Sequence, residues 1–110
     1  MAHVETIMVS TESGEAVALM THFSSSVHSE ERSVTEIRIE GLVLDVEPFD
    51  MYDGFSTAVD VYGTSPENAK SNARYIFDLL SRETKWRIAL GFDENDNPIL
   101  ERPEIRTTDG

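Results

Sequence analysis

Residues 55–80, FSTAVDVYGTSPENAKSNARYIFDLL, predict how a strand is followed by a helix in this chain. Apolar and polar residues alternate over its first part, residues 55–63, with the period of a half-buried strand. Ser65 then suits a helix N-cap, Pro66 the first helical position and Glu67 the positive end of the helix dipole. Beyond them the apolar residues recur at the spacing of one helical stripe: Ala69, Ala73, Ile76, Phe77 and Leu80. An amphipathic helix needs an apolar surface to cover, so this stretch predicts a helix packed on a sheet.

The residues before this stretch predict strands. Residues 4–10 and 16–23 are short β-rich runs on either side of a turn that contains Gly14, which predicts a hairpin. Residues 34–49 form the longest strand candidate, and its apolar side changes phase at Gly41. A β-bulge produces such a change, and so does a tight turn between two strands; we favour the bulge. Residues 24–33, SSSVHSEERS, predict a mobile polar loop.

Two further apolar runs follow the predicted helix. They cover residues 86–92 and 99–101, with a turn rich in Asp and Asn between them, and Pro103 is typical of an edge strand. The order β-β-β-β-α-β-β predicts an α+β fold, a mostly antiparallel sheet of about six strands with one amphipathic helix packed on one face. We expect residues 1–110 to form a single domain, with a frayed tail at 106–110.

Residues 61–73, VYGTSPENAKSNA, resemble the strand–helix junction of HicB-type antitoxins, where a similar spacing of Gly, Thr, Glu, Ala and Asn begins a helix beside a small sheet. The resemblance consists of capping and stripe positions. It implies that local structure and carries no function.

The composition excludes several classes of protein. With 39% hydrophobic residues the chain can form a core, and it contains no apolar run long enough to span a membrane. The absence of cysteine excludes disulfides and thiolate chemistry. The first residues lack the pattern of a signal peptide, so we expect a cytoplasmic protein. Because 21 acidic residues face 9 Lys and Arg, the net charge is −12, which argues against direct binding of nucleic acid or an anionic membrane.

No motif predicts catalysis or a cofactor. The serines at 24–26 beside His28 lie in the polar loop rather than on a nucleophile elbow, and Asp50 and Asp53 belong to a glycine-containing turn. The nearest match to a metal motif, positions 1, 3, 5 and 12 of a calcium loop, falls on Asp93, Asn95, Asn97 and Glu104. Pro98 occupies the position where that loop needs glycine, so a calcium- or ligand-binding module is the less favoured hypothesis. Because no motif predicts catalysis, we do not expect an enzyme.

The negative charge is uneven along the chain. Residues 1–65 hold 12 acids and 2 bases, residues 66–92 hold 3 acids and 5 bases, and residues 93–110 hold 6 acids and 2 bases. If the strand at 34–49 pairs with the strand at 55–63, Glu36, Glu40, Asp45, Glu47 and Asp60 share the sheet face away from the helix. One interpretation is that the negative charge of this face only keeps the protein soluble. The functional interpretation is a contact surface for a basic protein.

We therefore predict a small acidic non-catalytic protein that binds and blocks a basic protein surface. It would be of inhibitor or immunity type, such as a phage or mobile-element blocker of a nuclease or another nucleic-acid-binding protein. The predicted contacts are the acids and aromatic anchors Glu36, Glu40, Asp45, Glu47, Phe49, Asp50, Tyr52, Asp53, Asp60 and Tyr62. The alternative is a structural or assembly subunit that forms homodimers through the strand at 16–23 or the Pro103 edge.

Overall fold

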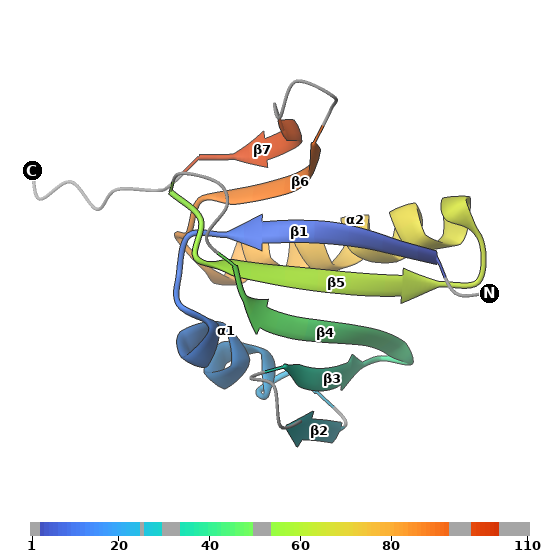
Figure 1. Cartoon of the computed structure of the whole chain (residues 1–110), viewed down its shortest axis with the longest axis horizontal. Helices are drawn as coiled ribbons and strands as arrows, with labels where there is room; N and C mark the ends of the chain where they lie inside the picture. The colour runs from blue at the N-terminus through green and yellow to red at the C-terminus, as the bar shows by residue number, and fades with distance from the viewer. Residues whose placement is uncertain (1–2, 25, 30–33, 50–53, 93–97, 104–110) are drawn as a thin grey trace, which may run out of the picture.

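A computed structural model of the chain, which describes residues 3–24, 26–29, 34–49, 54–92 and 98–103, shows an α+β fold (Figure 1). The seven strands form one sheet in the order β2-β3-β4-β5-β1-β6-β7, and every pair of neighbours is antiparallel. The elements in chain order are β1 His3–Val9, α1 Ser13–Met20, β2 Ser26–Ser29, β3 Thr35–Ile39, β4 Leu42–Pro48, β5 Thr57–Gly63, α2 Pro66–Glu83, β6 Ile88–Phe92 and β7 Pro98–Arg102. The predicted fold class is confirmed, with α1 and β2 as elements that the sequence did not predict.

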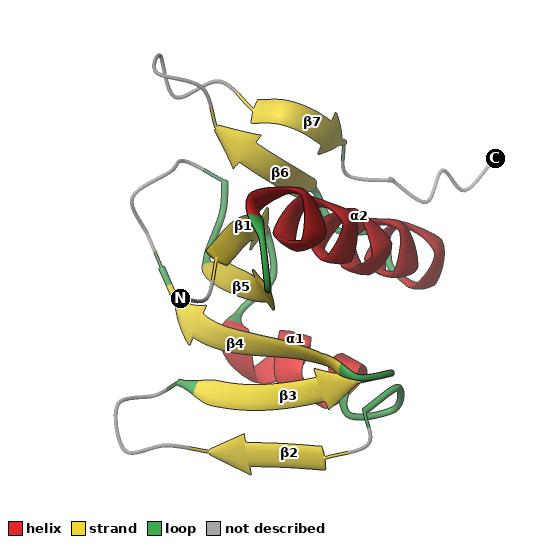
Figure 2. Cartoon of the chain, turned by 90° about the vertical axis from the view of Figure 1, so that its right-hand side faces the viewer, coloured by secondary structure: helices red, strands yellow, loops and turns green. Residues whose placement is uncertain are grey.

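Both helices pack on the same face of the sheet. Helix α2 lies against β5, β1 and β6, and α1 against β4 and β5 (Figure 2). The side chains of both helices and of this sheet face form one core, which includes Ile7, Val59 and Ile88 from the strands and Met20 from α1. Within the residues that the structure describes, no helix lies on the opposite face.

Helix α2 begins and packs as its sequence predicts. The Ser65 side chain accepts a hydrogen bond from the Asn68 backbone N–H at 3.0 Å, and Pro66 occupies the first turn. The predicted stripe is buried along its whole length, and Leu79 joins it. The helix connects β5 to β6 across β1, which lies between those two strands and is antiparallel to both (Figure 1).

The predicted strand at 16–23 is wrong, because Ser13–Met20 forms α1. Ala16 and Met20, four residues apart, are buried against the sheet, while Ala18 is exposed. Ala, Leu, Met and Glu favour helix, and a short apolar run with two apolar sides fits either element. Tertiary contact with β4 and β5 selects the helix, and residues 4–10 consequently pair with β5 and β6 instead.

The change of phase at Gly41 marks a hairpin rather than the favoured bulge. Strands β3 and β4 pair through Ile39 and Leu42, and the two residues between them, Glu40 and Gly41, both have positive φ, 49° and 83°. Positive φ at both central positions is the requirement of a type I′ turn. Paired residues share a face, so the odd-numbered apolar residues of β3 and the even-numbered ones of β4 point into the same core.

The predicted loop at 24–33 contains a strand. Ser26–Ser29 forms β2, which pairs with β3 and makes one edge of the sheet. The other edge is β7, as Pro103 indicates. Neither helix is long and apolar enough to cross a membrane.

Candidate protein-binding face

The sheet face away from the two helices is the surface on which the predicted acidic contacts can meet, and we call it the open face. Strand alternation places Asp45 and Glu47 of β4 there, because Leu44 and Val46 are buried in the core on the other side. Residues directly opposite each other in neighbouring strands point to the same face of the sheet. The open face therefore also includes Glu36, Asp60, Tyr62, Val4, Thr6 and Met8.

Three acidic residues form a row across the open face. Glu36 of β3 pairs with Asp45 of β4, and Asp45 pairs with Asp60 of β5. Glu47 lies two residues from Asp45 on the same strand, and all four side chains are partly exposed. We call Glu36, Asp45, Glu47 and Asp60 the acidic patch. Like charges directly opposite each other destabilise a sheet, so this row costs the fold stability.

Two hydroxyl groups hold two of the carboxylates of the patch, those of Asp45 and Asp60, in place. The Tyr62 hydroxyl donates to Asp45 Oδ2 at 2.6 Å, and Thr6 Oγ1 donates to Asp60 Oδ1 at 2.7 Å. The hydrogen bond to Asp45, together with burial and the nearby negative charges, raises the pKa of Tyr62 well above its ordinary value. Tyr62 is therefore a neutral donor throughout the physiological range, and it orders the Asp45 carboxylate without neutralising it.

Among the described residues, Arg38 and Arg87 bring positive charge to the open face. Arg38 Nε is 3.2 Å from Glu36 Oε1, and Arg87 pairs with Glu101 beside β6 and β7. The Arg87 guanidinium also lies over the Phe55 ring, 4.4 Å from its centroid. Among the described residues, Asp45, Glu47 and Asp60 form no ion pair, so the centre of the patch keeps its negative charge.

An apolar cluster adjoins the patch on the same face. Met8, Phe55, Ala58 and Ala89 are buried together, and Phe49 packs against them. Ala58 is directly opposite Glu47 in the sheet, so the cluster and the patch meet at this pair. The open face thus combines a charged region with a packed apolar support.

The structure brings together only some of the predicted contacts. Asp45, Glu47, Asp60 and Tyr62 lie side by side on β4 and β5, with Glu36 on the adjacent strand, and Phe49 belongs to the apolar cluster. Asp50, Tyr52 and Asp53 lie outside the described residues.

The placement of Glu40 on the open face is wrong. Glu40 sits in the β3–β4 turn, and its Oε2 accepts a hydrogen bond from the Tyr75 hydroxyl of α2 at 2.6 Å. A turn residue does not follow the alternation of a strand, so counting odd and even positions along the chain assigned Glu40 to the wrong face. This bond raises the pKa of Tyr75.

Sequence reasoning missed Val4 and Thr6. Val4 is directly opposite Tyr62 and is 49% exposed, and Thr6 is directly opposite Asp60. The alternation of Val4 and Thr6 with the core residue Ile7 is visible in the sequence. The predicted hairpin, however, paired residues 4–10 with residues 16–23, so it did not place Val4 and Thr6 beside β5. An exposed valine beside a tyrosine supplies an apolar contact next to the acidic patch.

The remaining candidate chemistry finds no support in the described part of the chain. No group of three His, Asp or Glu side chains there could hold a metal ion. Ser24 Oγ donates to the Thr21 carbonyl oxygen at 3.0 Å, which is a local turn contact. Of the calcium-loop match, residues 93–97 and Glu104 lie outside the described residues.

Comparison of the chain with protein-family models, with curated proteins and with solved structures found no match.

Proposed function

We propose that this protein is a non-catalytic binding protein that docks the open face of its sheet onto a basic surface of another protein. The observation that carries the proposal is the row of acids in which Asp45 is directly opposite both Glu36 and Asp60. Solubility requires only that acids lie on the surface, and placing like charges directly opposite each other destabilises the sheet. A basic partner would offset this repulsion, because its positive charges attract the acids of the row.

The hydroxyl contacts support the same conclusion. A carboxylate held by Tyr62 or Thr6 loses little side-chain freedom when it meets a Lys or Arg, which favours binding. Val4 and Tyr62 add apolar and aromatic area next to the charges. Tyr and Arg are enriched among the residues that dominate binding energy, so we assign Tyr62 as the anchor of the surface.

Basic surfaces of proteins commonly serve to hold nucleic acid. A compact acidic protein that covers such a surface excludes the nucleic acid, and its charge speeds the encounter. We therefore propose a blocking role of inhibitor or immunity type in the cytoplasm, with a nuclease or another nucleic-acid-handling enzyme as the partner.

The test compares two variants that change the net charge equally. Asp45→Asn/Glu47→Gln/Asp60→Asn neutralises the centre of the patch, and Glu12→Gln/Glu67→Gln/Glu83→Gln neutralises three exposed acids on or beside the helices. Each tagged protein is used to capture binders from the native host, and zero-length carbodiimide coupling then joins carboxylates to lysines in contact. We expect wild type and the helix variant to retain the same basic protein, with cross-links at Asp45, Glu47 or Asp60.

The open-face variant should lose that protein or release it at lower salt. Raising the salt from about 0.1 M to about 1 M shortens the Debye length from roughly 10 Å to roughly 3 Å and should release the partner from wild type. Equal retention by both variants, or cross-links confined to α2, would show that the open face is not the contact surface.

A further inference from the structure

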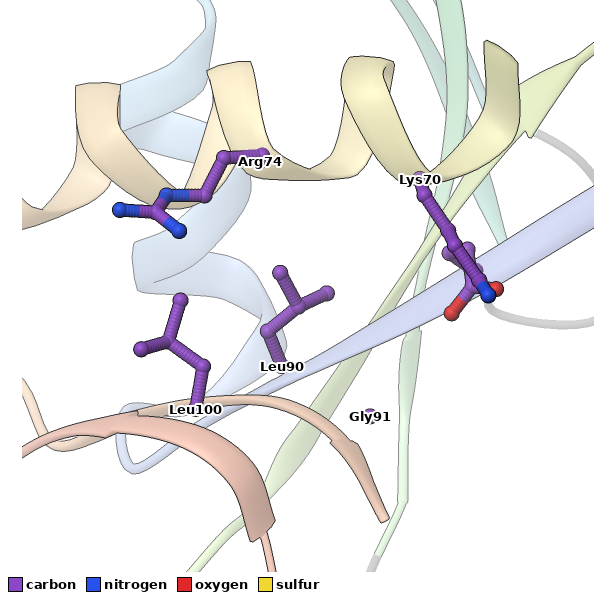
Figure 3. A pocket seen from close by; sticks show the side chains of 6 residues that line it. Lys70, Arg74, Leu90, Gly91 and Leu100 are labelled. Atoms are coloured by element: carbon purple, nitrogen blue, oxygen red, sulfur yellow. The ribbon is translucent and has the colours of Figure 1, made fainter. Parts of the chain in front are cut away.

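On the helix side of the sheet, an open hollow of about 450 Å³ lies between α2 and the β6–β7 hairpin. Its lining comes from four elements: Glu5 of β1, Lys70 and Arg74 of α2, Leu90 and Gly91 of β6, and Leu100 of β7. Figure 3 shows Leu90 and Leu100 pointing from β6 and β7 toward α2, with the side chains of Lys70 and Arg74 extending from the helix to opposite sides of Leu90. The volume lies in the range of small-molecule sites, roughly 300–1,000 Å³.

The walls of the hollow differ in chemistry. Leu90 and Leu100 pack against the main core and present an apolar wall. Lys70 and Arg74 are both exposed and stand one helical turn apart, so their charges lie on the same side of α2. Two of the nine basic residues of a chain with net charge −12 therefore line a single hollow.

The internal partners of these cations leave positive charge free for a ligand. Lys70 forms no ion pair among the described residues, although Glu5 lines the same hollow. Arg74 Nε is 3.1 Å from Asp78 Oδ1, but both side chains are more than half exposed, and such surface pairs are weak. Like charges four residues apart destabilise a helix slightly, and an anion bound beside them would reduce that cost.

We infer that this hollow binds a small anionic amphiphile, with its apolar body against Leu90 and Leu100 and its anionic head attracted to the positive charge of Lys70 and Arg74. The site is separate from the open face, because Glu5 and Leu90 occupy the other side of their strands from Thr6 and Ala89. Either a carboxylate or a phosphate suits the head, since Arg and Lys bind both.

The test titrates the full chain with decanoate, decyl phosphate, decanol and acetate, followed by heteronuclear NMR of the backbone amides. We expect saturable shifts at Lys70, Leu90, Gly91 and Leu100 with the two anionic amphiphiles, at least tenfold weaker binding of decanol and no saturation with acetate. The tighter of the two anionic probes identifies the head group.

Two double variants with equal charge change separate a binding site from a surface effect. Lys70→Gln/Arg74→Gln should weaken the binding of the anionic amphiphiles at least tenfold. Arg82→Gln/Lys85→Gln, in the last turn of α2 and just beyond it, should change their affinity less than twofold. Absence of saturable shifts, or equal affinity for decanol and decanoate with no effect of Lys70→Gln/Arg74→Gln, would overturn the inference. In that case the basic side chains merely cover the leucines with their aliphatic stems.

Discussion

At Gly63 the end of β5 meets the first turn of α2 without room for a side chain. A Cβ there would lie 2.6 Å from Ala69 Cα and 2.8 Å from the Asn68 carbonyl carbon, and still closer to the Ala69 nitrogen. All three atoms belong to the backbone and cannot yield as a flexible side chain does. We expect Gly63→Ala to lower the free energy of unfolding by about 1–3 kcal/mol, measured by urea denaturation.

The matched control for this substitution is Gly14→Ala in α1, where an added Cβ meets nothing within 4 Å. Alanine favours helix over glycine, so this variant should be neutral or more stable by up to about 1 kcal/mol. Similar losses at both positions would mean that the close approach at Gly63 is not the cause.

Tyr62 provides a second prediction, which depends on pH. Its pKa is raised in the folded protein, so the bond to Asp45 stabilises the fold fully below the ordinary tyrosine pKa of about 10 and progressively less at higher pH. At pH 7, Tyr62→Phe should cost about 1 kcal/mol. The gap in unfolding free energy between wild type and this variant should shrink above pH 10, and a gap that stays constant from pH 7 to the alkaline range would contradict the proposed bond.

At the scale of elements, the Arg102 side chain of β7 forms hydrogen bonds to the end of α2. Arg102 Nη1 donates to the Ser81 carbonyl oxygen at 2.7 Å and Nε to the Trp86 carbonyl oxygen at 3.1 Å, so the guanidinium caps the end of α2 and the segment that leads to β6. Burial of this group lowers the pKa of Arg102. Arg102→Met leaves these acceptors without their donor and should cost about 2 kcal/mol.

Trp86, the one tryptophan of the chain, lies next to this contact and reports it by fluorescence during urea denaturation. The exposed Arg82 in the last turn of α2 is the control, and Arg82→Met should change stability by less than about 0.5 kcal/mol. Equal effects of the two variants would show that Arg102 contributes only its charge.

The elements that the sequence predicted are those whose signals are local. The cap and stripe of α2 lie within one helix, and the alternation that places Asp45 and Asp60 on one face lies within single strands. One error arose where distant contacts decide, because α1 packs against β4 and β5, which come much later in the chain. The other error is local: a change of phase at a glycine fits a bulge as well as a turn, and the positive φ of Glu40 and Gly41 produces the turn. The acidic patch could be predicted in part, but not the partners of β1, because pairing with β5 joins residues far apart in the chain.

For the whole molecule, the uneven charge predicts how stability depends on salt. A net charge of −12 repels itself, and the repulsion is strongest where Asp45 and Asp60 are directly opposite. We expect the urea midpoint of the wild type to rise as salt is raised from about 0.1 M to about 1 M. Asp45→Asn/Glu47→Gln/Asp60→Asn should begin at a higher midpoint and gain less from salt than Glu12→Gln/Glu67→Gln/Glu83→Gln. If salt raised the urea midpoint equally in the two variants, the repulsion would be spread evenly over the surface and not concentrated in the acidic patch.

The place of β1 in the sheet also determines how the protein folds. Strands β2 to β5 follow one another in both chain and sheet, so they can pair as soon as they are formed. β1 is the first strand of the chain but sits between β5 and β6, and it has no partner until the middle of the chain has been ordered. Long-range pairings of this kind raise contact order and slow folding. We therefore expect the insertion of the first strand between two later ones to limit the rate of folding. Until it occurs, the apolar residues Ile7 and Val9 would be open to association with other chains.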